Sequence, residues 1–133
     1  MKRVLQSFAL KGRDAVVKYC IVGKVKPEYL EEYKKLHREI HKGPYRELLK
    51  VIRDSGVKEE AVFMYGNLAI IFYEAEDLDM CYQQQGSADV AKRWNDLMSP
   101  MFDSSYEFNV SDKLPLLEKV FDLNEQLDGR LNR

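Results

Sequence analysis

Residues 59–74 read EEAVFMYGNLAIIFYE, a pattern that sets the fold class of the chain. Two runs rich in aliphatic and aromatic residues flank Gly66, which is typical of a β-hairpin. The pattern therefore predicts two strands, over roughly residues 59–65 and 67–74. The apolar side chains expected to form the core are Phe63, Met64, Leu68, Ile70 and Phe72.

The segment before this hairpin predicts one strand and two helices. Residues 16–25 are rich in β-branched side chains and predict a strand. Residues 27–42 have apolar side chains at spacings of three and four, which is typical of an amphipathic helix, and Gly43-Pro44 ends it. A second helix follows and stops near Gly56. Inward-facing positions are expected at Leu30, Tyr33, His37 and Ile40 in the first helix, and at Tyr45, Leu48, Leu49 and Ile52 in the second.

The segment after the hairpin predicts two more helices and a strand. Asp77 and Ser87 are candidate N-caps, because their side chains can accept hydrogen bonds from a first helical turn. A last strand is expected over residues 118–123, followed by a frayed tail after about residue 125. Residues 4–10 are compatible with a further short strand.

The expected order, β-α-α-β-β-α-α-β, is typical of a ferredoxin-like α+β fold, an antiparallel sheet covered on one face by helices. No linker or repeat divides the 133 residues, which fits one domain. The other face of the sheet would expose side chains such as Cys20 and Val22. Dimerisation would cover this face, although a sheet face can also enclose a ligand pocket.

The composition narrows the function classes. Apolar residues make up 45% and charged residues 32%, as in soluble globular proteins. The net charge of −1 gives no basic field for nucleic acid, so no such partner is expected. No apolar run approaches the roughly 20 residues of a membrane span, so no membrane is expected either. Two cysteines, Cys20 and Cys81, make no disulfide framework, and we expect a cytoplasmic protein.

Tyr33, His37 and His41 are four residues apart, so a continuous helix would place them on one side. Imidazole exchanges protons near neutral pH, which makes His37 a candidate acid–base group beside Tyr33. The alternative is a core histidine with one satisfied hydrogen bond. His37 and His41 also have the spacing of a zinc helix, but Arg38 stands where zinc proteases carry Glu. No third ligand is evident, so we expect no metal.

Trp94 is the only tryptophan. A lone tryptophan commonly anchors a helix on a sheet. Its ring can alternatively stack on the apolar face of a sugar, with Arg93 and Asn95 beside it as hydrogen-bond donors. The residues alone leave both interpretations open.

Five segments resemble, in order, the pattern of the L-rhamnose mutarotase family. The resemblance covers residues 18–123, which leaves residues 1–17 as an N-terminal extension or extra strand and residues 124–133 as a C-terminal tail. It implies a homodimeric ferredoxin-like α/β barrel and an isomerase that interconverts α and β anomers of a 6-deoxy sugar without a cofactor. The segments are Lys24–Pro27 (KVKP), Glu31–His37 (EEYKKLH), Gly66–Leu68 (GNL), Asp89–Trp94 (DVAKRW) and Glu118–Leu123 (EKVFDL).

The resemblance also implies residue roles. The helix histidine of the family is the proton donor and falls on His37, while Tyr33 and Trp94 fall on positions that contact the sugar. The catalytic pair is thus His37 and Tyr33, and the remaining sugar-binding wall departs from the family pattern. These departures, which we still expect to contact substrate, are Asn95 in place of a tryptophan, Glu60 in place of a tyrosine, and His41 near a tryptophan position.

The predicted fold is also compatible with other functions. One is a non-catalytic domain that binds a sugar or another small molecule. Another is a dimeric α+β barrel enzyme such as a cofactor-independent or haem-handling monooxygenase, with His37 or His41 as an axial ligand. A purely structural interaction protein leaves the coincidence of His37, Tyr33 and Trp94 unexplained. A mutarotase for L-rhamnose or a related sugar is therefore the leading prediction.

Overall fold

A three-stranded antiparallel sheet, in the order β1-β3-β2, lies at the centre of the protein. The computed structural model describes residues 16–103 and 114–129. Within them the strands are β1 (Val17–Lys24), β2 (Glu59–Tyr65) and β3 (Leu68–Ala75). The predicted first strand and the predicted hairpin are both confirmed.

The hairpin register fixes which side chains share a face of the sheet. Gly66 at the turn has a φ of 60°, which a residue with a Cβ rarely adopts. Strand pairing from this turn places Glu60 directly opposite Tyr73. Because side chains alternate along a strand, Glu60 points to the same face as Val62 and Met64.

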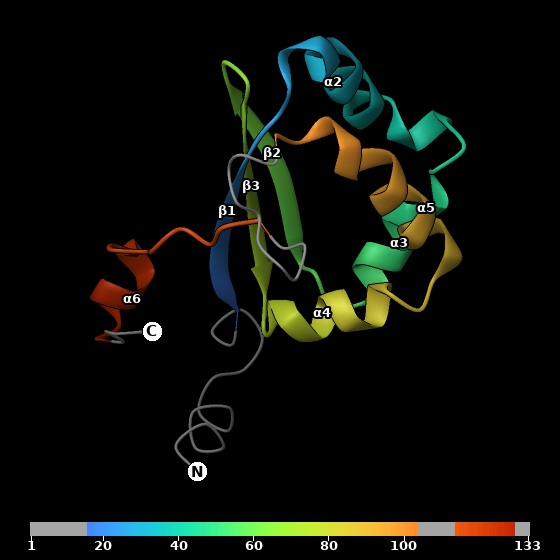
Figure 1. The fold of residues 1–133 in the computed structure, drawn as a ribbon. Coiled ribbons are helices and arrows are strands. Elements are labelled where there is room, and N and C mark those ends of the chain that lie inside the picture. Colours follow the sequence, from blue (N-terminus) through green and yellow to red (C-terminus); the bar gives the residue numbers. More distant parts are fainter. Residues whose placement is uncertain (1–15, 104–113, 130–133) are drawn as a thin grey trace.

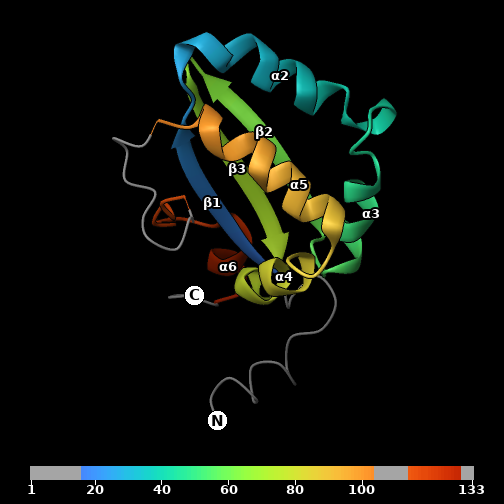
Figure 2. The same ribbon diagram turned by 45° about the vertical axis from the view of Figure 1, so that its right-hand side comes forward.

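Four of the described helices cover one face of the sheet (Figures 1 and 2). They are α2 (Leu30–Arg38), α3 (Glu47–Asp54), α4 (Leu78–Gln85) and α5 (Asp89–Met98). On the opposite side of the sheet lies α6 (Leu123–Leu127) (Figure 1). This arrangement confirms the predicted α+β class. Short 3₁₀ turns are η2 (Pro27–Tyr29), η3 (Ile40–Lys42) and η4 (Ser99–Met101).

The helices bury the face of β3 that carries Ala69, Ile71 and Tyr73. Met64 packs on this covered face, as predicted. Both faces of the hairpin are apolar, so alternation alone does not tell which face the helices cover. The core prediction was therefore wrong for four side chains that lie on the other face, here called the open face: Phe63, Leu68, Ile70 and Phe72.

The single helix predicted over residues 27–42 is interrupted. α2 ends at Arg38, and the chain continues into the tighter turn η3. Gly43 is extended, with φ −107° and ψ −170°, because a residue before proline avoids the helical conformation and Pro44 follows. His41 therefore lies outside α2.

The helix caps agree with the sequence at Asp77 but not at Ser87. Asp77 Oδ1 accepts a hydrogen bond from the Met80 backbone N–H at 3.2 Å and caps α4. α5 has Ala88 at its N-cap position and no side-chain cap. The Ser87 hydroxyl instead donates to the Gln84 carbonyl at 2.9 Å, so it closes the turn after α4.

The C-terminal segment docks on β1 but does not form the predicted strand. Two backbone hydrogen bonds join it to the sheet, from Val22 N–H to Pro115 O (3.1 Å) and from Leu117 N–H to Cys20 O (2.8 Å). The strand predicted over residues 118–123 is wrong, since the chain leaves the sheet there and enters α6. α6 also runs through the point where a frayed tail was expected.

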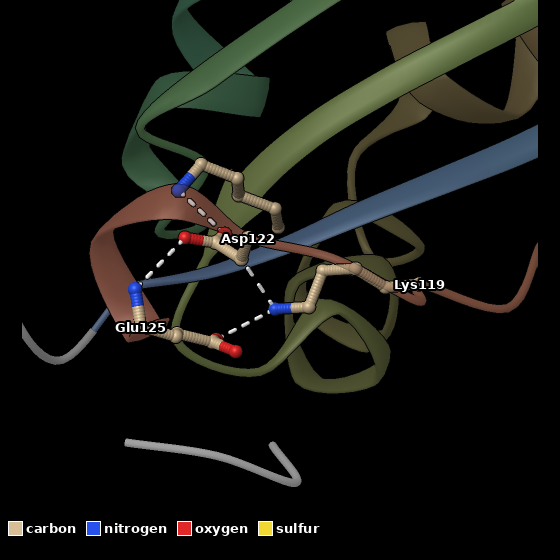
Figure 3. Close-up of polar contacts among 4 residues, drawn as sticks. Lys119, Asp122 and Glu125 are labelled. Atoms are coloured by element: carbon tan, nitrogen blue, oxygen red, sulfur yellow. Dashed lines mark hydrogen bonds and ion pairs between the residues drawn. The ribbon is translucent and has the colours of Figure 1, made fainter. Parts of the chain in front are cut away.

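Charged side chains anchor α6 to β1 (Figure 3). Lys18 Nζ lies 2.9 Å from Asp122 Oδ2, and Lys119 Nζ lies 3.7 Å from the same atom and 2.6 Å from Glu125 Oε2. Asp122 Oδ1 also caps α6 by accepting from the Glu125 N–H. Lys119 and Asp122 are three residues apart and act on one side of the chain, which the alternation of a strand would not allow.

The described residues contain no helix with the length and apolar character needed to cross a bilayer. The longest helix there is α5 with 10 residues, whereas a membrane span requires about 20. The strand expected at residues 4–10 lies outside the described residues.

Candidate active site

A hydrogen bond within α2 fixes the imidazole of His37. Its Nδ1 lies 2.7 Å from the carbonyl oxygen of Tyr33, one turn earlier. A carbonyl oxygen can only accept, so Nδ1 donates its proton there and Nε2 carries the lone pair. The two rings are also close, with centroids 4.2 Å apart. The structure thus brings the predicted pair together and leaves the lone pair of Nε2 available to accept a hydrogen bond or a proton.

Trp94 of α5 lies beside His37. Its ring contacts His37 edge-on, with centroids 5.2 Å apart, and contacts Tyr45 in the same way at 5.3 Å. The sequence predicted Trp94 as a candidate sugar contact, but it predicted Tyr45 only as an inward-facing residue of a helix. Arg93, expected beside a sugar, instead pairs with Asp89 at 2.9 Å and lies over the Tyr45 ring.

Glu60 reaches this group from the sheet. Its carboxylate accepts a hydrogen bond from the Tyr73 hydroxyl across the hairpin. The residue is exposed to solvent, yet the protein around it removes enough water to raise the pKa of Glu60 to about 7. The charge of Glu60 also raises the pKa of Tyr33, so the two groups lie within electrostatic range. We call Tyr33, His37, Glu60 and Trp94 the His37 site.

Burial sets the protonation states of the two α2 residues. It lowers the pKa of His37 below its usual 6.5, and the bond to the Tyr33 carbonyl opposes only part of this shift. Burial and then the charge of Glu60 raise the pKa of the Tyr33 phenol. At neutral pH the site therefore presents a neutral imidazole and a protonated phenol.

His41 and Asn95, also predicted to contact substrate, are not joined to the His37 site. His41 is exposed in η3, and Asn95 is exposed on α5. Among the described residues, no hydrogen bond or ring contact connects either one to the site. The four-residue spacing of His37 and His41 would place them on one face only in a continuous helix, and α2 ends at Arg38.

Phe102 supports Tyr33 from the end of η4. The two rings meet edge to face, with centroids 5.7 Å apart. This packing depends on Gly23 of β1, since a Cβ there would lie 2.6 Å from the Phe102 ring. A glycine inside a strand is the sequence signal for such a close approach, and Phe102 is absent from the predicted site.

Tyr73 borders the His37 site through Glu60, although the sequence predicted it only as part of a strand. Its hydroxyl bonds to Glu60 and to Tyr82 of α4, whose ring lies 5.8 Å away. A usable signal was present, because the turn at Gly66 fixes the register that sets Glu60 opposite Tyr73.

The groups that converge at the His37 site are suited to proton transfer and hydrogen bonding. Within residues 16–103 and 114–129, no cluster of three His, Cys, Asp or Glu side chains is placed to hold a metal ion. The zinc-helix spacing of His37 and His41 is also lost, because the two residues lie on different elements.

Comparisons with known proteins agree on one family and one fold. The family model of L-rhamnose mutarotase matches residues 18–123. Among solved structures, the chain is similar to the L-rhamnose mutarotase of Formosa agariphila (TM-score 0.57, 22% identity, 80% of this chain, 97% of that chain). It is also similar to tetracenomycin F2 cyclase, a type-II polyketide cyclase of Streptomyces glaucescens (TM-score 0.54, 16% identity, 80% of this chain, 95% of that chain). No curated protein matches. These structural likenesses show the ferredoxin-like fold.

Proposed function

Because the chain belongs to the L-rhamnose mutarotase family, we propose that it is an isomerase that interconverts the α and β anomers of L-rhamnose or a related 6-deoxy aldopyranose. The observation that carries the proposal is the geometry of His37. Its Nδ1 is engaged by the Tyr33 carbonyl, which leaves Nε2 to exchange protons with a bound sugar. The adjacent Trp94 indole, which is partly exposed, supplies a surface of the kind that holds a pyranose.

Mutarotation requires the sugar ring to open and close again. The anomeric hydroxyl loses a proton, the ring oxygen gains one as the C1–O5 bond breaks, and the aldehyde recloses after rotation about C1–C2. The lowered pKa of His37 favours the base form at neutral pH, so we assign Nε2 first to the anomeric hydroxyl. The family resemblance implies instead that His37 donates a proton to the sugar. Donation requires the imidazolium form of His37, which is the less populated form at neutral pH. Proton transfer by a positioned side chain typically contributes about 10²–10⁴-fold.

The hydrogen-bonding groups of the site suit a polyol. Tyr33 keeps its proton at neutral pH and can donate to a sugar oxygen. Glu60 can accept from or donate to a hydroxyl, according to its protonation. Trp94 is partly exposed and offers apolar area to sugar C–H groups.

We also propose that the enzyme is a homodimer that pairs through the open face of the sheet. Phe63 and Tyr65 of β2 are 61% and 77% exposed on this face. Val22, Ile70 and Phe72 are only partly covered there. An apolar face of this kind is expected to be covered by a partner of the same shape.

The direct test is magnetisation-transfer NMR between the anomeric protons of L-rhamnose, with L-fucose and L-lyxose alongside. The wild-type protein should accelerate exchange of at least one sugar, and His37→Ala should reduce the acceleration by about 10²-fold or more. The control is Arg38→Ala, which changes the exposed next residue of α2 and should leave exchange unchanged. Circular dichroism would check that both variants are folded.

Three outcomes separate the candidate functions. Exchange that is lost only in His37→Ala supports the mutarotase and the role of His37. Normal exchange in a folded His37→Ala protein would show that another group transfers the proton. Saturable sugar binding without faster exchange in the wild type would indicate a binding domain on this fold.

A further inference from the structure

Glu60 occupies a position between two parts of the core. Val62 and Met64, two and four residues later on the same face of β2, pack against the cluster that contains Tyr33. Tyr73, directly opposite Glu60, belongs to the cluster beneath α4. The side chain of Glu60 therefore leaves the sheet on the side where α2 and α5 carry His37 and Trp94.

Neutral phenols surround this carboxyl. Tyr73 bonds to it directly, Tyr82 bonds to Tyr73, and Tyr33 lies within electrostatic range from α2. Within the described part of the chain, Glu60 forms no ion pair with Lys, Arg or His. The other carboxylate of this strand end, Glu59, points to the open face opposite Glu74. With no cationic partner among residues 16–103 and 114–129, the protonated form of Glu60 is favoured relative to an ordinary surface glutamate.

We propose that Glu60 is the second catalytic residue of the His37 site and donates the proton that the ring oxygen receives when the sugar opens. This assignment rests on the proposed mutarotase function. Nε2 of His37 takes the proton of the anomeric hydroxyl, the electron pair of that O–H bond becomes part of the new C1=O bond, and the C1–O5 pair accepts the proton of Glu60. On closure both protons return, so neither group needs an external acid or base.

The protonation states of the two residues support this division of roles. A pKa of about 7 leaves a large fraction of Glu60 protonated at neutral pH, while the lowered pKa of His37 keeps the imidazole neutral. If the roles were reversed, His37 would donate as an imidazolium and Glu60 would accept as a carboxylate. The lowered pKa of His37 and the raised pKa of Glu60 disfavour these two forms. Two titratable groups whose environments push them toward complementary states are suited to paired acid and base roles.

The test combines steady-state kinetics with direct titration of the carboxyl. Glu60→Gln keeps the size and hydrogen bonding of the side chain but cannot donate a carboxyl proton, so kcat should fall by about 10²-fold with a smaller change in KM. In the wild type, kcat/KM should fall as the pH rises through about 7, and this alkaline limb should vanish in Glu60→Gln. Glu59→Gln, on the open face, is the matched control and should retain both kcat and the limb.

Tyr73→Phe is a second variant, which changes the pKa of Glu60 but keeps its carboxyl group. The Tyr73 hydroxyl lowers the pKa of Glu60 by stabilising the carboxylate, so its loss should shift the alkaline limb to higher pH. Carbon-13 NMR of protein labelled at the glutamate carboxyl carbon, assigned with Glu60→Gln, should show one carboxyl that titrates near pH 7.

Each outcome decides the proposal. A Glu60 carboxyl that titrates near pH 4, or exchange that Glu60→Gln leaves unchanged, would overturn the role of Glu60 alone. A higher KM with normal kcat would reduce Glu60 to a sugar-binding residue. A wild-type protein that does not accelerate exchange would overturn the mutarotase function and this role with it, even if the carboxyl titrates as expected.

Discussion

Tyr33 acts on the site through three of its parts. Its carbonyl orients His37, its ring packs against the imidazole, and its phenol lies in the field of Glu60. The four-residue spacing of Tyr33 and His37 made this pair predictable, because both lie within one regular helix. Trp94 came to the site only through the resemblance, and Tyr45 was missed, because contacts between separate helices leave no local pattern.

At the residue scale we predict that Trp94→Phe weakens both the fold and sugar binding. The smaller ring would lose part of the edge contacts to His37 and Tyr45, so the free energy of unfolding should fall by about 1 kcal/mol. KM should rise more than kcat falls, because Trp94 is assigned to hold the sugar and not to transfer protons. Urea unfolding and exchange kinetics measure the two effects. An unchanged KM would remove Trp94 from the sugar site.

At the scale of elements, the sequence predicted regular segments well and failed where the ends of elements depend on tertiary contacts. The strand predicted at residues 118–123 does not form, because Asp122 pairs with Lys18 of β1 and caps α6. The first interaction joins residues far apart in the sequence and the second is a helix cap, and strand periodicity represents neither. The helix predicted over residues 27–42 is divided, because α2 ends at Arg38 and the turn η3 follows; Pro44 accounts only for the extended Gly43 after that turn.

The anchor of α6 predicts a pH dependence of stability. Its partners hold the pKa of Asp122 at about 2, below the ordinary 3.8, so the carboxylate stabilises the fold above the higher value and this contribution is lost as the pH falls toward 2. Urea midpoints of the wild type and of Asp122→Asn should differ at neutral pH and converge on acidification. Asparagine can still cap a helix, so the variant isolates the ion pair. A difference that persists at pH 2 would contradict this account.

The contact between η4 and β1 predicts a strong effect of one added methyl group. Gly23→Ala would force Phe102 away from its place against Tyr33 and should lower the free energy of unfolding by about 1–3 kcal/mol. Gly86→Ala is the control, since Gly86 has a helical φ of −63° and an added Cβ would lie 3.5 Å from the carbonyl oxygens of Gln83 and Tyr82, an ordinary contact distance. Denaturant unfolding of both variants measures the difference. Equal stability of the two proteins would show that Phe102 moves without cost.

At the scale of the whole molecule, the order of strands and helices from β1 to α5 followed from the sequence, but the end of the chain and the choice of sheet face did not. Leu68, Ile70 and Phe72 alternate with Ala69, Ile71 and Tyr73, so either set could have formed the core. The helices cover the second set, in which the small Ala69 allows close packing. The same ambiguity leaves the open face apolar, which is why a second copy of the chain is the expected partner.

The proposed dimer predicts that one charge on the open face separates the subunits. Phe63→Arg should give a folded monomer by sedimentation analysis, while the wild type sediments as a dimer. Met80→Arg is the matched control, because Met80 on α4 is also 61% exposed but lies outside the open face. A wild-type monomer, or a Phe63→Arg protein that stays dimeric, would contradict pairing through this face.

The hairpin register has a consequence for how this site can change in evolution. One residue inserted between Glu60 and Gly66 would turn Glu60 away from Tyr73 and out to the open face, whereas two inserted residues would restore its direction. Substitutions at position 60 are therefore accessible one at a time, because they leave this register unchanged. Length changes in β2 are tolerated only in pairs, so lineages that share this chemistry should vary here in side chain and keep the same spacing.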